Sequence, residues 1–435
     1  MSGGSLSIAT VSAPRRLVNR LLGRVRNQVA FLIVIAVLLP AVTYQIVFSL
    51  PSFIIVQAAT IGGCALAMVS GYMAYRKLLV FPGISAGGYA ITSMTASFGV
   101  LTTLLVFLRV DYSRWQLFSS YLLSTAGLLL IHLFVERRRH RTFAYVRGGR
   151  TDALPDVPGI RWIGIPSPDT RLENVNLVVV DLHHDHDAAW EHAIARWVLA
   201  GIPVYDTRLA IEQITGKVEI NHISENTLGS LNPNALLIKA KSVADLLVAA
   251  TLLLLLLPIM ALIAIGIRMD SPGPAIFRQQ RTGFRAHPFT VYKFRTMKVA
   301  FEATDAERAR QQAMTQDEDV RITRLGRFLR RSRLDELPQL FNIVLGDMSL
   351  IGPRPEAISL SDWYSREIPY YHYRHIIKPG LTGWAQINQG HVTTVDEIRE
   401  KLNLDFYYVK NYSLWLDTLI LLRTIAIMVS GHGAR

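Results

Sequence analysis

Long apolar stretches dominate the first third of the chain. They are Val29–Leu50, Phe53–Tyr75, Ala86–Val110 and Leu117–Val135. Each is close to the roughly 20 residues that a helix needs to cross the hydrocarbon core of a membrane. The pattern therefore predicts a bundle of four transmembrane helices within residues 29–136, preceded by a basic cytoplasmic arm at residues 1–28.

Positive charges at the ends of these stretches predict their orientation. Five arginines lie in the arm before the first stretch, Arg76 and Lys77 follow the second, and "ERRRHR" (Glu136–Arg141) follows the fourth. The short loop between the first two stretches has no basic residue. Cytoplasmic loops carry an excess of lysine and arginine, so both ends of the bundle are predicted to lie in the cytoplasm.

Residues 142–232 have the character of a small soluble α/β domain. "VNLVVVDL" (Val175–Leu182) is a continuous β-branched run, which is typical of a buried parallel strand. The helical stretch "AAWEHAIARWVLA" follows and stops at Gly201, and "IPVYD" has the pattern of the next strand. This order predicts a small Rossmann-like α/β domain.

Two short segments of this domain carry candidate chemistry. "VRGGR" (Val146–Arg150) has the glycines of a phosphate-binding turn, and "DLHHDHD" (Asp181–Asp187) has the side chains of a metal site. Two adjacent glycines are a weak signal, the region has no clear GxGxxG turn, and polar residues after a strand usually form only a loop. A scaffold domain with an ordinary loop is therefore the favoured interpretation.

Val243–Ile267 is a further apolar stretch that is long enough to span a membrane. It contains Asp245 near its start and Pro258 past its middle, and a proline removes a backbone hydrogen bond and clashes with the preceding turn. If this helix crossed the membrane straight through, the basic residues 268–333 would lie outside the cytoplasm. Segments rich in lysine and arginine are usually kept inside it. We therefore favour a re-entrant helix at 243–267 that breaks at Pro258 and returns to the face it entered. A fifth, kinked spanning helix is the alternative.

The composition limits the classes of function. Of 435 residues, 50% are hydrophobic and 18% are charged, which indicates a membrane protein with soluble parts. The net charge of +13 suits cytoplasmic loops, anionic lipid headgroups or a phosphorylated substrate. No stripe or motif for nucleic acid is found, so no nucleic-acid partner is predicted. Cys64 is the only cysteine, which excludes cysteine-based zinc or redox sites.

Two adjacent carboxylates, Asp335 and Glu336, stand out within the basic segment "RRSRLDELPQL". The leucine and phenylalanine spacing after them predicts a helix that stops at Gly346. Pro338 is tolerated only in the first turn of that helix, which places Asp335 at or near the N-cap and Glu336 at the first helical position. The helix dipole at this end favours ionised carboxylates and bound phosphate.

Arginines around the pair give it a chemical interpretation. An ionised aspartate beside a diphosphate can act as a nucleophile on phosphorus, and an adjacent glutamate can hold a divalent cation. Nearby arginines would offset the repulsion between the carboxylates and the phosphates. An isolated Asp–Glu pair is more often only a helix cap with a surface acid, and any single arginine more often faces solvent or lipid headgroups.

Five motifs that occur in order resemble those of one family. They are "FRQQRTG" (Phe277–Gly283), "FTVYKFRTM" (Phe289–Met297), Arg321–Pro355, "PGLTGWAQI" (Pro379–Ile387) and Glu400–Leu421. Residues 241–435 thus resemble the catalytic domain of the bacterial sugar transferases, the monotopic polyprenyl-phosphate phosphoglycosyl transferases. The membrane bundle and α/β domain resemble the long form of that family, the undecaprenyl-phosphate glucose- or galactose-phosphate transferases.

The resemblance implies roles for individual residues. Asp335 would be the nucleophile, Glu336 a Mg²⁺ ligand and Pro258 the break of the re-entrant helix. Residues matching the family's substrate-contact motifs are Arg281, Lys293, Arg295, Arg321, Pro353 and Arg354, with packing or headgroup contact as the alternative for each basic one. Pro353 and Pro355 would shape a loop near the nucleotide. Asp405 and Asp417 match family positions too, with a structural role equally open.

The implied reaction moves a sugar 1-phosphate, with glucose 1-phosphate favoured, from a UDP-sugar to undecaprenyl phosphate, releases UMP and starts a polysaccharide repeat. The implied place is the bacterial inner membrane, as a multi-pass protein in contact with membrane lipids and with the catalytic domain on the cytoplasmic face. Two alternatives stay open, a glycosyltransferase that releases UDP and a non-catalytic scaffold. The oligomeric state is also open, a homodimer included.

Overall fold

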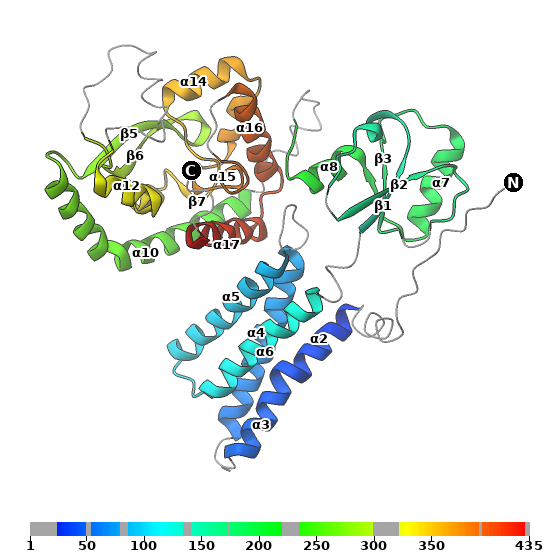
Figure 1. The fold of residues 1–435 in the computed structure, drawn as a ribbon, viewed down its shortest axis with the longest axis horizontal. Helices are drawn as coiled ribbons and strands as arrows, with labels where there is room; N and C mark the ends of the chain where they lie inside the picture. The colour runs from blue at the N-terminus through cyan, green and yellow to red at the C-terminus, as the bar shows by residue number, and fades with distance from the viewer. Residues whose placement is uncertain are drawn as a thin grey trace. The chain divides into compact units, whose positions relative to one another are not determined.

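The computed structural model describes residues 24–48, 54–78, 86–133, 141–157, 159–172, 175–219, 235–298, 322–390 and 394–430. The chain forms two compact units, Met1–Thr215 and Gly216–Arg435 (Figure 1). The first contains the membrane helices and a parallel sheet, and the second contains the five motifs.

The predicted helices of the first third are confirmed within the described residues. α2 (Val25–Ile33), a π-helical segment (Val34–Leu38) and α3 (Leu39–Phe48) follow one another without a break, and α4 (Ile54–Leu78), α5 (Ala86–Phe107) and α6 (Arg114–Ile131) come next. Four described helical segments are long and apolar enough to cross a membrane: Val25–Ile46, Ala58–Lys77, Tyr89–Phe107 and Ala235–Asp270. The chain is therefore a membrane protein.

α6 covers most of the fourth predicted stretch, but it is not among the four described segments that are long and apolar enough to cross a membrane. Ser113 caps its start by accepting a hydrogen bond from the backbone N–H of Gln116. Gln116, Ser120 and Ser124 repeat every four residues and are fully buried, so they form one polar stripe directed into the bundle. Small and polar side chains are typical of contacts between membrane helices.

The predicted α/β character of the middle region is confirmed. The strands β1 (Arg141–Val146), β2 (Ile160–Ile165), β3 (Leu177–Val180) and β4 (Val204–Asp206) form one parallel sheet in the order β2-β1-β3-β4. α7 (Ala188–Leu199) lies between β3 and β4, and α8 (Thr207–Thr215) follows β4. A 3₁₀ turn, Gly149–Ala153, connects β1 to β2. The predicted strand–helix–strand segment is therefore the β3–α7–β4 part of a larger sheet.

α10 (Ala235–Asp270) is the longest helix of the second unit, with 36 residues, and contains Pro258. It bends along its length (Figure 1), and its interior proline is the usual cause of such a bend. Ala249, in its first half, packs in one core cluster with Leu340 and Ile343. Met260 and Ile267, in its second half, belong to another. Both halves thus lie against one folded unit.

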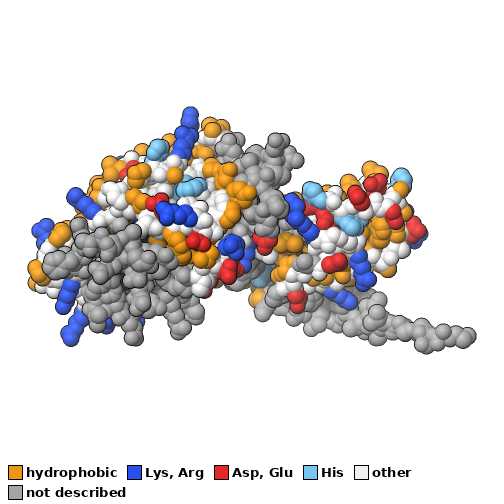
Figure 2. Space-filling model, turned by 90° about the horizontal axis from the view of Figure 1, so that it is seen from above, with side chains coloured by type: hydrophobic (Ala, Val, Ile, Leu, Met, Phe, Trp, Pro, Cys, Tyr) orange, Lys and Arg blue, Asp and Glu red, His pale blue; other side chains and the backbone are white. Residues whose placement is uncertain are grey.

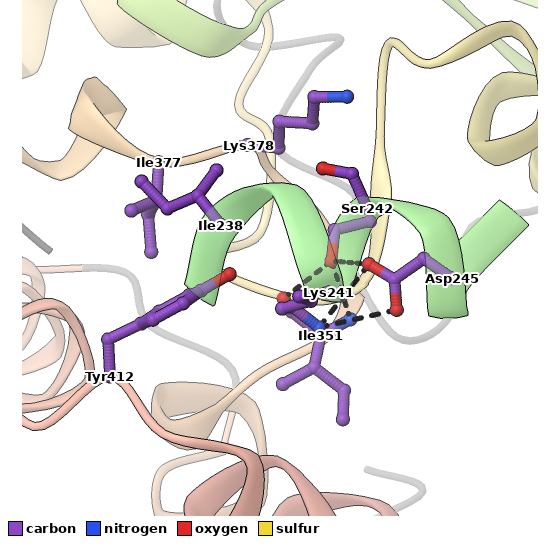
Figure 3. Close-up of a pocket in the computed structure, with 9 residues that line it drawn as sticks. Ile238, Lys241, Ser242, Asp245, Ile351, Ile377, Lys378 and Tyr412 are labelled. Carbon is purple, nitrogen blue, oxygen red and sulfur yellow. Dashed lines mark hydrogen bonds and ion pairs between the residues drawn. The ribbon is translucent and has the colours of Figure 1, made fainter. Parts of the chain in front are cut away.

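The start of α10 is fixed by buried charged side chains. Lys241 Nζ lies 3.3 Å from Asp245 on the same helix and 2.9 Å from Asp417 on α17 (Leu414–Ser430). Ser349 donates its hydroxyl to Asp245, and Tyr408 donates its own to Asp417. Figure 3 shows Lys241 and Asp245 facing one another beside a small pocket. Asp417, one of the residues that match family positions, therefore has a structural partner.

The remaining elements build the body that carries the motifs. β5 (Ile276–Thr282) and β6 (Pro288–Phe294) form an antiparallel hairpin, and β7 (Ser349–Ile351) pairs in parallel with β8 (Gly380–Thr382). The other helices are α12 (Arg324–Arg331), α13 (Gln339–Leu345), α14 (Ile358–Glu367), α15 (Trp384–Asn388) and α16 (Val395–Lys410).

Glycines explain why β7 and β8 approach so closely. A Cβ at Gly352 would lie 2.4 Å from the carbonyl oxygen of Lys378, and one at Gly380 would lie 2.0 Å from the backbone nitrogen of Gly352. Neither distance is compatible with a larger residue, so the motifs "GPRP" and "PGLTG" meet through their backbones.

Candidate active site

The two carboxylates lie in a tight turn before α13. Arg333 has a left-handed backbone conformation with φ of 58°, and the 3₁₀ turn Leu334–Glu336 follows it. Leu337 N–H then bonds to the Leu334 carbonyl at 3.2 Å, and α13 begins only after Pro338. The expected positions are therefore corrected, because Asp335 and Glu336 occupy a 3₁₀ turn and Pro338, at the N-cap of α13, separates them from the α-helix.

Glu336 is the buried centre of the site. Its Oε1 atom lies 2.7 Å from Arg354 Nη2 and 3.1 Å from Lys293 Nζ, with Arg333 Nη1 farther away at 3.9 Å. Burial alone would raise the pKa of Glu336, but Arg354 and Lys293 outweigh it and hold the pKa well below its usual range. Glu336 is therefore ionised at neutral pH.

Lys293 comes to this centre from β6. Burial lowers the pKa of Lys293 to about 8, although Glu336 acts in the opposite direction. The residue thus keeps its charge at neutral pH and loses it in mildly alkaline solution. The antiparallel register that pairs Lys293 with Phe277 fixes the strand from which it reaches the carboxylate.

Asp335 is more accessible than its neighbour, with intermediate exposure. Burial raises the pKa of Asp335, Glu336 raises it further, and Lys293, Arg354 and Arg330 act in the opposite direction. Four charged side chains from β6, α12, the turn and the loop after β7 thus act on one carboxylate. Asp335 is therefore accessible to a charged ligand, whereas Glu336 is buried beside it.

The other predicted substrate residues fall in different places. Arg281 on β5 donates to the Pro355 carbonyl and to the side chain of Gln279. Arg295 is buried and donates to the Ser271 and Pro272 carbonyls, beyond the end of α10. The described bonds of both guanidiniums thus go to protein atoms.

Pro353 is buried, and its carbonyl accepts the Gly380 N–H at 3.0 Å, so it shapes the loop through its backbone. Arg321 lies outside the described residues. Substrate contact by Arg281, Arg295, Arg321 and Pro353 stays a prediction.

Several residues that the motifs did not single out support the site. Arg374 donates to Asp405, to Tyr371 and to the carbonyl of Arg354. Asp405, which matches a family position, thus has a partner that also touches the loop of Arg354. Such links are long-range in the sequence, and only "YYHYRH" with its basic residues could have drawn attention to Arg374.

Glu356 is a second buried acid near this loop. Lys401 on α16 binds its carboxylate at 2.6 Å. Burial alone would raise the pKa of Glu356, but Lys401, Arg374 and Arg281 together hold it far below its usual range. The pair ties the end of the "GPRP" loop to α16.

The candidate chemistry of the middle domain gathers at the carboxyl edge of its sheet. Carboxylate and imidazole atoms of Asp181, His183 and Asp206 lie within 4.8 Å of one another. Asp181 accepts backbone N–H groups from Arg150 and His183, and Asp206 accepts those of Leu182 and Arg208. The two carboxylates therefore order the loops after β1, β3 and β4.

The glycine pair of this domain has a packing explanation. Gly149 has φ of 61°, and a Cβ there would lie 2.4 Å from Asp181 Oδ2. The "VRGGR" turn thus needs glycine to approach Asp181, whether or not a ligand binds. Nucleotide and metal binding here stay hypotheses.

Comparison with known proteins decides the family. Residues 237–431 match the family described as "Bacterial sugar transferase". A UDP-N-acetylgalactosamine-undecaprenyl-phosphate N-acetylgalactosaminephosphotransferase of Aeromonas hydrophila is 41% identical over 382 residues, which cover 87% of this chain and 89% of that protein. This chain belongs to the bacterial sugar transferase family. The resemblance of its five motifs is thereby confirmed.

Other relatives match less than half of this chain. The UDP-glucose:undecaprenyl-phosphate glucose-1-phosphate transferase of Caulobacter vibrioides is 43% identical over 196 residues, 45% of this chain and 71% of that protein. The protein of that name from Escherichia coli K12 is 41% identical over 187 residues, 42% of this chain and 39% of that protein. The alignment with the Aeromonas protein thus covers about twice as much of this sugar transferase as these two alignments do.

The donor set at the dyad fits Mg²⁺ only together with a substrate. All three cation contacts of Glu336 go to Oε1, and none of the described contacts goes to Oε2. Among the described residues, no third carboxylate or imidazole joins Asp335 and Glu336 in a ligand group. Mg²⁺ is commonly held by one or two carboxylates together with substrate phosphates, and this arrangement could supply that kind of site.

Proposed function

We propose that this sugar transferase moves a sugar 1-phosphate from a UDP-sugar to undecaprenyl phosphate and releases UMP, as the first step of an exopolysaccharide, capsule or O-antigen repeat. The observation that carries the proposal is the charge arrangement at the dyad. A buried, ionised Glu336 is neutralised by Lys293 and Arg354, beside a more accessible Asp335. Relatives with the same family motifs are named for this class of reaction.

In the first step, a carboxylate oxygen of Asp335 attacks the β-phosphorus of the UDP-sugar. The bond between the β-phosphorus and the bridging oxygen breaks, and UMP leaves with that electron pair. The sugar phosphate is then bound to Asp335 as an acyl phosphate. A raised pKa of Asp335 makes its carboxylate more basic than usual, which suits a nucleophile at neutral pH.

In the second step, a phosphate oxygen of undecaprenyl phosphate attacks the same phosphorus. The acyl–oxygen bond to phosphorus breaks, Asp335 is regenerated as a carboxylate, and an undecaprenyl diphosphosugar is formed. Arg354 and Lys293 contribute positive charge next to both displacements, where negative charge accumulates on the phosphoryl oxygens.

Mg²⁺ is the proposed cofactor, and Glu336 with its free Oε2 is the proposed protein ligand. When bound, the ion would neutralise charge on the diphosphate. Lys293 and Arg354 keep Glu336 in one orientation in the meantime. The protein therefore presents one fixed carboxylate oxygen toward the phosphates.

We further propose that α10 is a re-entrant helix. A straight helix of 36 residues would be about 54 Å long, more than the roughly 30 Å core of a bilayer. Asp245 near its start is bonded by Ser349, and Ser271 just beyond its end is bonded by Arg295, and both partners belong to the same folded unit. One unit can hold both ends on one face only if the helix returns to that face.

The surface of α10 supports the same placement. Its large apolar side chains Leu254, Leu255 and Leu262 are strongly exposed, at 75%, 69% and 69%. Arg324, Arg327 and Arg331 are exposed on the neighbouring α12. The face displayed in Figure 2, which is seen from above, instead mixes hydrophobic, basic and acidic side chains. We place this unit at the cytoplasmic face of the bacterial inner membrane, where UDP-sugars are present and basic residues are retained.

The donor sugar is proposed from the length of the alignments. The relative that matches 87% of this chain is named for N-acetylgalactosamine, and relatives named for glucose match 45% and 42% of it at similar identity. UDP-N-acetylgalactosamine is therefore the first donor to test, and UDP-glucose, which the sequence favoured, is the second.

The deciding experiment incubates the purified chain with undecaprenyl phosphate, Mg²⁺ and a panel of UDP-sugars. Phosphoglycosyl transfer produces UMP and a lipid diphosphosugar in equal amounts. Release of UDP instead would identify a glycosyltransferase. A chain that releases neither nucleotide with any donor, although it is folded and embedded in lipid, would favour the scaffold function.

A further inference from the structure

The loop Pro353–Glu356 is held at every one of its carbonyl groups. Gly380 N–H donates to Pro353 at 3.0 Å, and Thr282 N–H donates to Glu356 at 3.0 Å. Side chains hold the other two, Arg281 at Pro355 and Arg374 at Arg354. The loop is largely buried, and its partners come from β5, from β8 and from Arg374, so its backbone is fixed in one direction.

Arg374 is the buried member of this set. Its side chain is 3% exposed, and its guanidinium donates to Asp405 Oδ2 at 3.0 Å, to the Tyr371 hydroxyl at 2.7 Å and to the Arg354 carbonyl at 2.9 Å. A guanidinium presents its donors in a fixed planar fork, so these three partners together leave it one orientation.

Arg354, one of these three partners of Arg374, is the principal cation of the active site. The guanidinium of Arg354 binds Glu336 at 2.7 Å, while its backbone carbonyl is held by Arg374. Pro355 restricts the backbone of the residue before it to extended conformations. With the carbonyl also fixed, the Arg354 side chain leaves the loop in one direction, toward Glu336.

We propose that Arg374 is a positioning residue for the transfer reaction, and that it acts by fixing the peptide group of Arg354 so that its guanidinium meets Glu336 and the donor diphosphate. This inference rests on the proposed function. Asp405 fixes Arg374 in turn and belongs to the same set. Neither residue touches the dyad, so both act through Arg354.

The competing explanation is a buried ion pair that serves folding alone. Such a pair would change the amount of folded protein without changing the reaction of the folded part. If Arg374 is instead a positioning residue, the effects on activity of substituting Arg374 and Arg354 must depend on each other.

The test compares variants of the full chain in lipid nanodiscs. Arg374→Lys keeps the positive charge, but one ammonium cannot reach Asp405, Tyr371 and the Arg354 carbonyl together. Arg374→Gln with Asp405→Asn removes both charges, so no buried carboxylate is left unpaired if the single variant fails to fold. Arg366→Gln, an exposed arginine on the nearby α14, is the matched control.

Two results are expected with the UMP assay. Arg374→Lys lowers kcat about tenfold with KM changed less than threefold, whereas Arg366→Gln leaves both unchanged. Adding Arg374→Lys to Arg354→Gln lowers kcat no further than Arg354→Gln alone. Additive losses, or an unchanged kcat with a lower amount of folded protein, would overturn the proposal.

Hydrogen exchange separates this proposal from the function on which it rests. Arg374→Lys should speed exchange of the amides in the segment 352–357 at least about tenfold, with the parallel sheet of the first unit unchanged. Unaltered exchange in that segment overturns the positioning role, even if the unmodified chain releases UMP. Absence of UMP release from the unmodified chain overturns the proposed function instead, and the exchange result then decides the role of Arg374 by itself.

Discussion

Arg354 Nη2 and Lys293 Nζ share one oxygen of Glu336, at 2.7 and 3.1 Å. The two cations offset the charge of Glu336, and the neighbouring Asp335 has a raised pKa because of its burial and of Glu336. This relationship connects the "FTVYKFRTM", "LDELPQ" and "GPRP" segments, which are separated by more than 40 residues in the first case and by 18 in the second. The two carboxylates therefore have different roles, because Oε1 of Glu336 is bound by cations and Asp335 is the carboxylate that remains to react.

The first prediction concerns the nucleophile. Asp335→Asn should lower UMP release at least about 1000-fold with every donor, because the amide keeps the shape of the turn but cannot form the acyl phosphate. Asp362→Asn on α14 is an exposed control and should retain activity. Acid-quenched enzyme incubated with a labelled donor alone should carry labelled phosphosugar in the unmodified chain and none in Asp335→Asn. Turnover by Asp335→Asn within tenfold of the unmodified chain would contradict this assignment.

The second prediction concerns alkaline pH. A lysine with a pKa of about 8 loses its charge above that pH, so kcat/KM of the unmodified enzyme should decline about tenfold for each unit above pH 8. Lys293→Arg keeps the cation at all accessible pH values and should remove this decline, although its activity at pH 7 can be lower. An identical alkaline limb in Lys293→Arg and the unmodified enzyme would assign the titration to another group.

The third prediction concerns the buried charges at the start of α10. Lys241→Met leaves the carboxylates of Asp245 and Asp417 without their shared cation, and we expect the second unit to lose about 3–5 kcal/mol of stability. Lys239→Met, an exposed lysine on the same helix, should change stability by less than about 0.5 kcal/mol. Denaturant titrations in detergent measure both.

A combined variant tests the reason for that loss. Lys241→Met with Asp245→Asn and Asp417→Asn removes the unpaired charges, so part of the lost stability should return. If the triple variant is even less stable than Lys241→Met, packing and not charge is what Lys241 contributes.

The parts of the fold and of the site that could be predicted from the sequence are those that depend on local interactions. The apolar stretches predicted the membrane helices, and the β-branched run at Val175–Leu182 predicted β3, because periodicity and composition are properties of the segment itself. The 3₁₀ turn at Leu334–Glu336 was not predicted, because the left-handed Arg333 before it has no glycine or asparagine to announce it.

Contacts between residues that are far apart in the sequence limited what could be predicted of the site. The resemblance of the motifs identified Lys293, Glu336 and Arg354 as candidate site residues, and the structure brings their side chains together. Arg374 escaped attention because two of its three partners, Asp405 and Arg354, lie 31 and 20 residues away in the sequence, where no local pattern indicates a contact. Arg295 had the expected motif, yet its bonds go to Ser271 and Pro272, since only the fold decides which basic side chain reaches which oxygen.

The fourth prediction tests the path of α10. In a chain whose Cys64 is replaced by alanine, single cysteines at Ala240 and Met269 mark the two ends of the helix, and both positions are exposed. A re-entrant helix places both on the same face, so a membrane-impermeant maleimide should label both in inverted vesicles and neither in sealed right-side-out vesicles. A spanning helix would give opposite labelling for the two positions and would remove the re-entrant proposal. Repeating the experiment with Pro258→Ala shows whether the proline turns the chain, because a straightened helix would expose Met269→Cys to the opposite side.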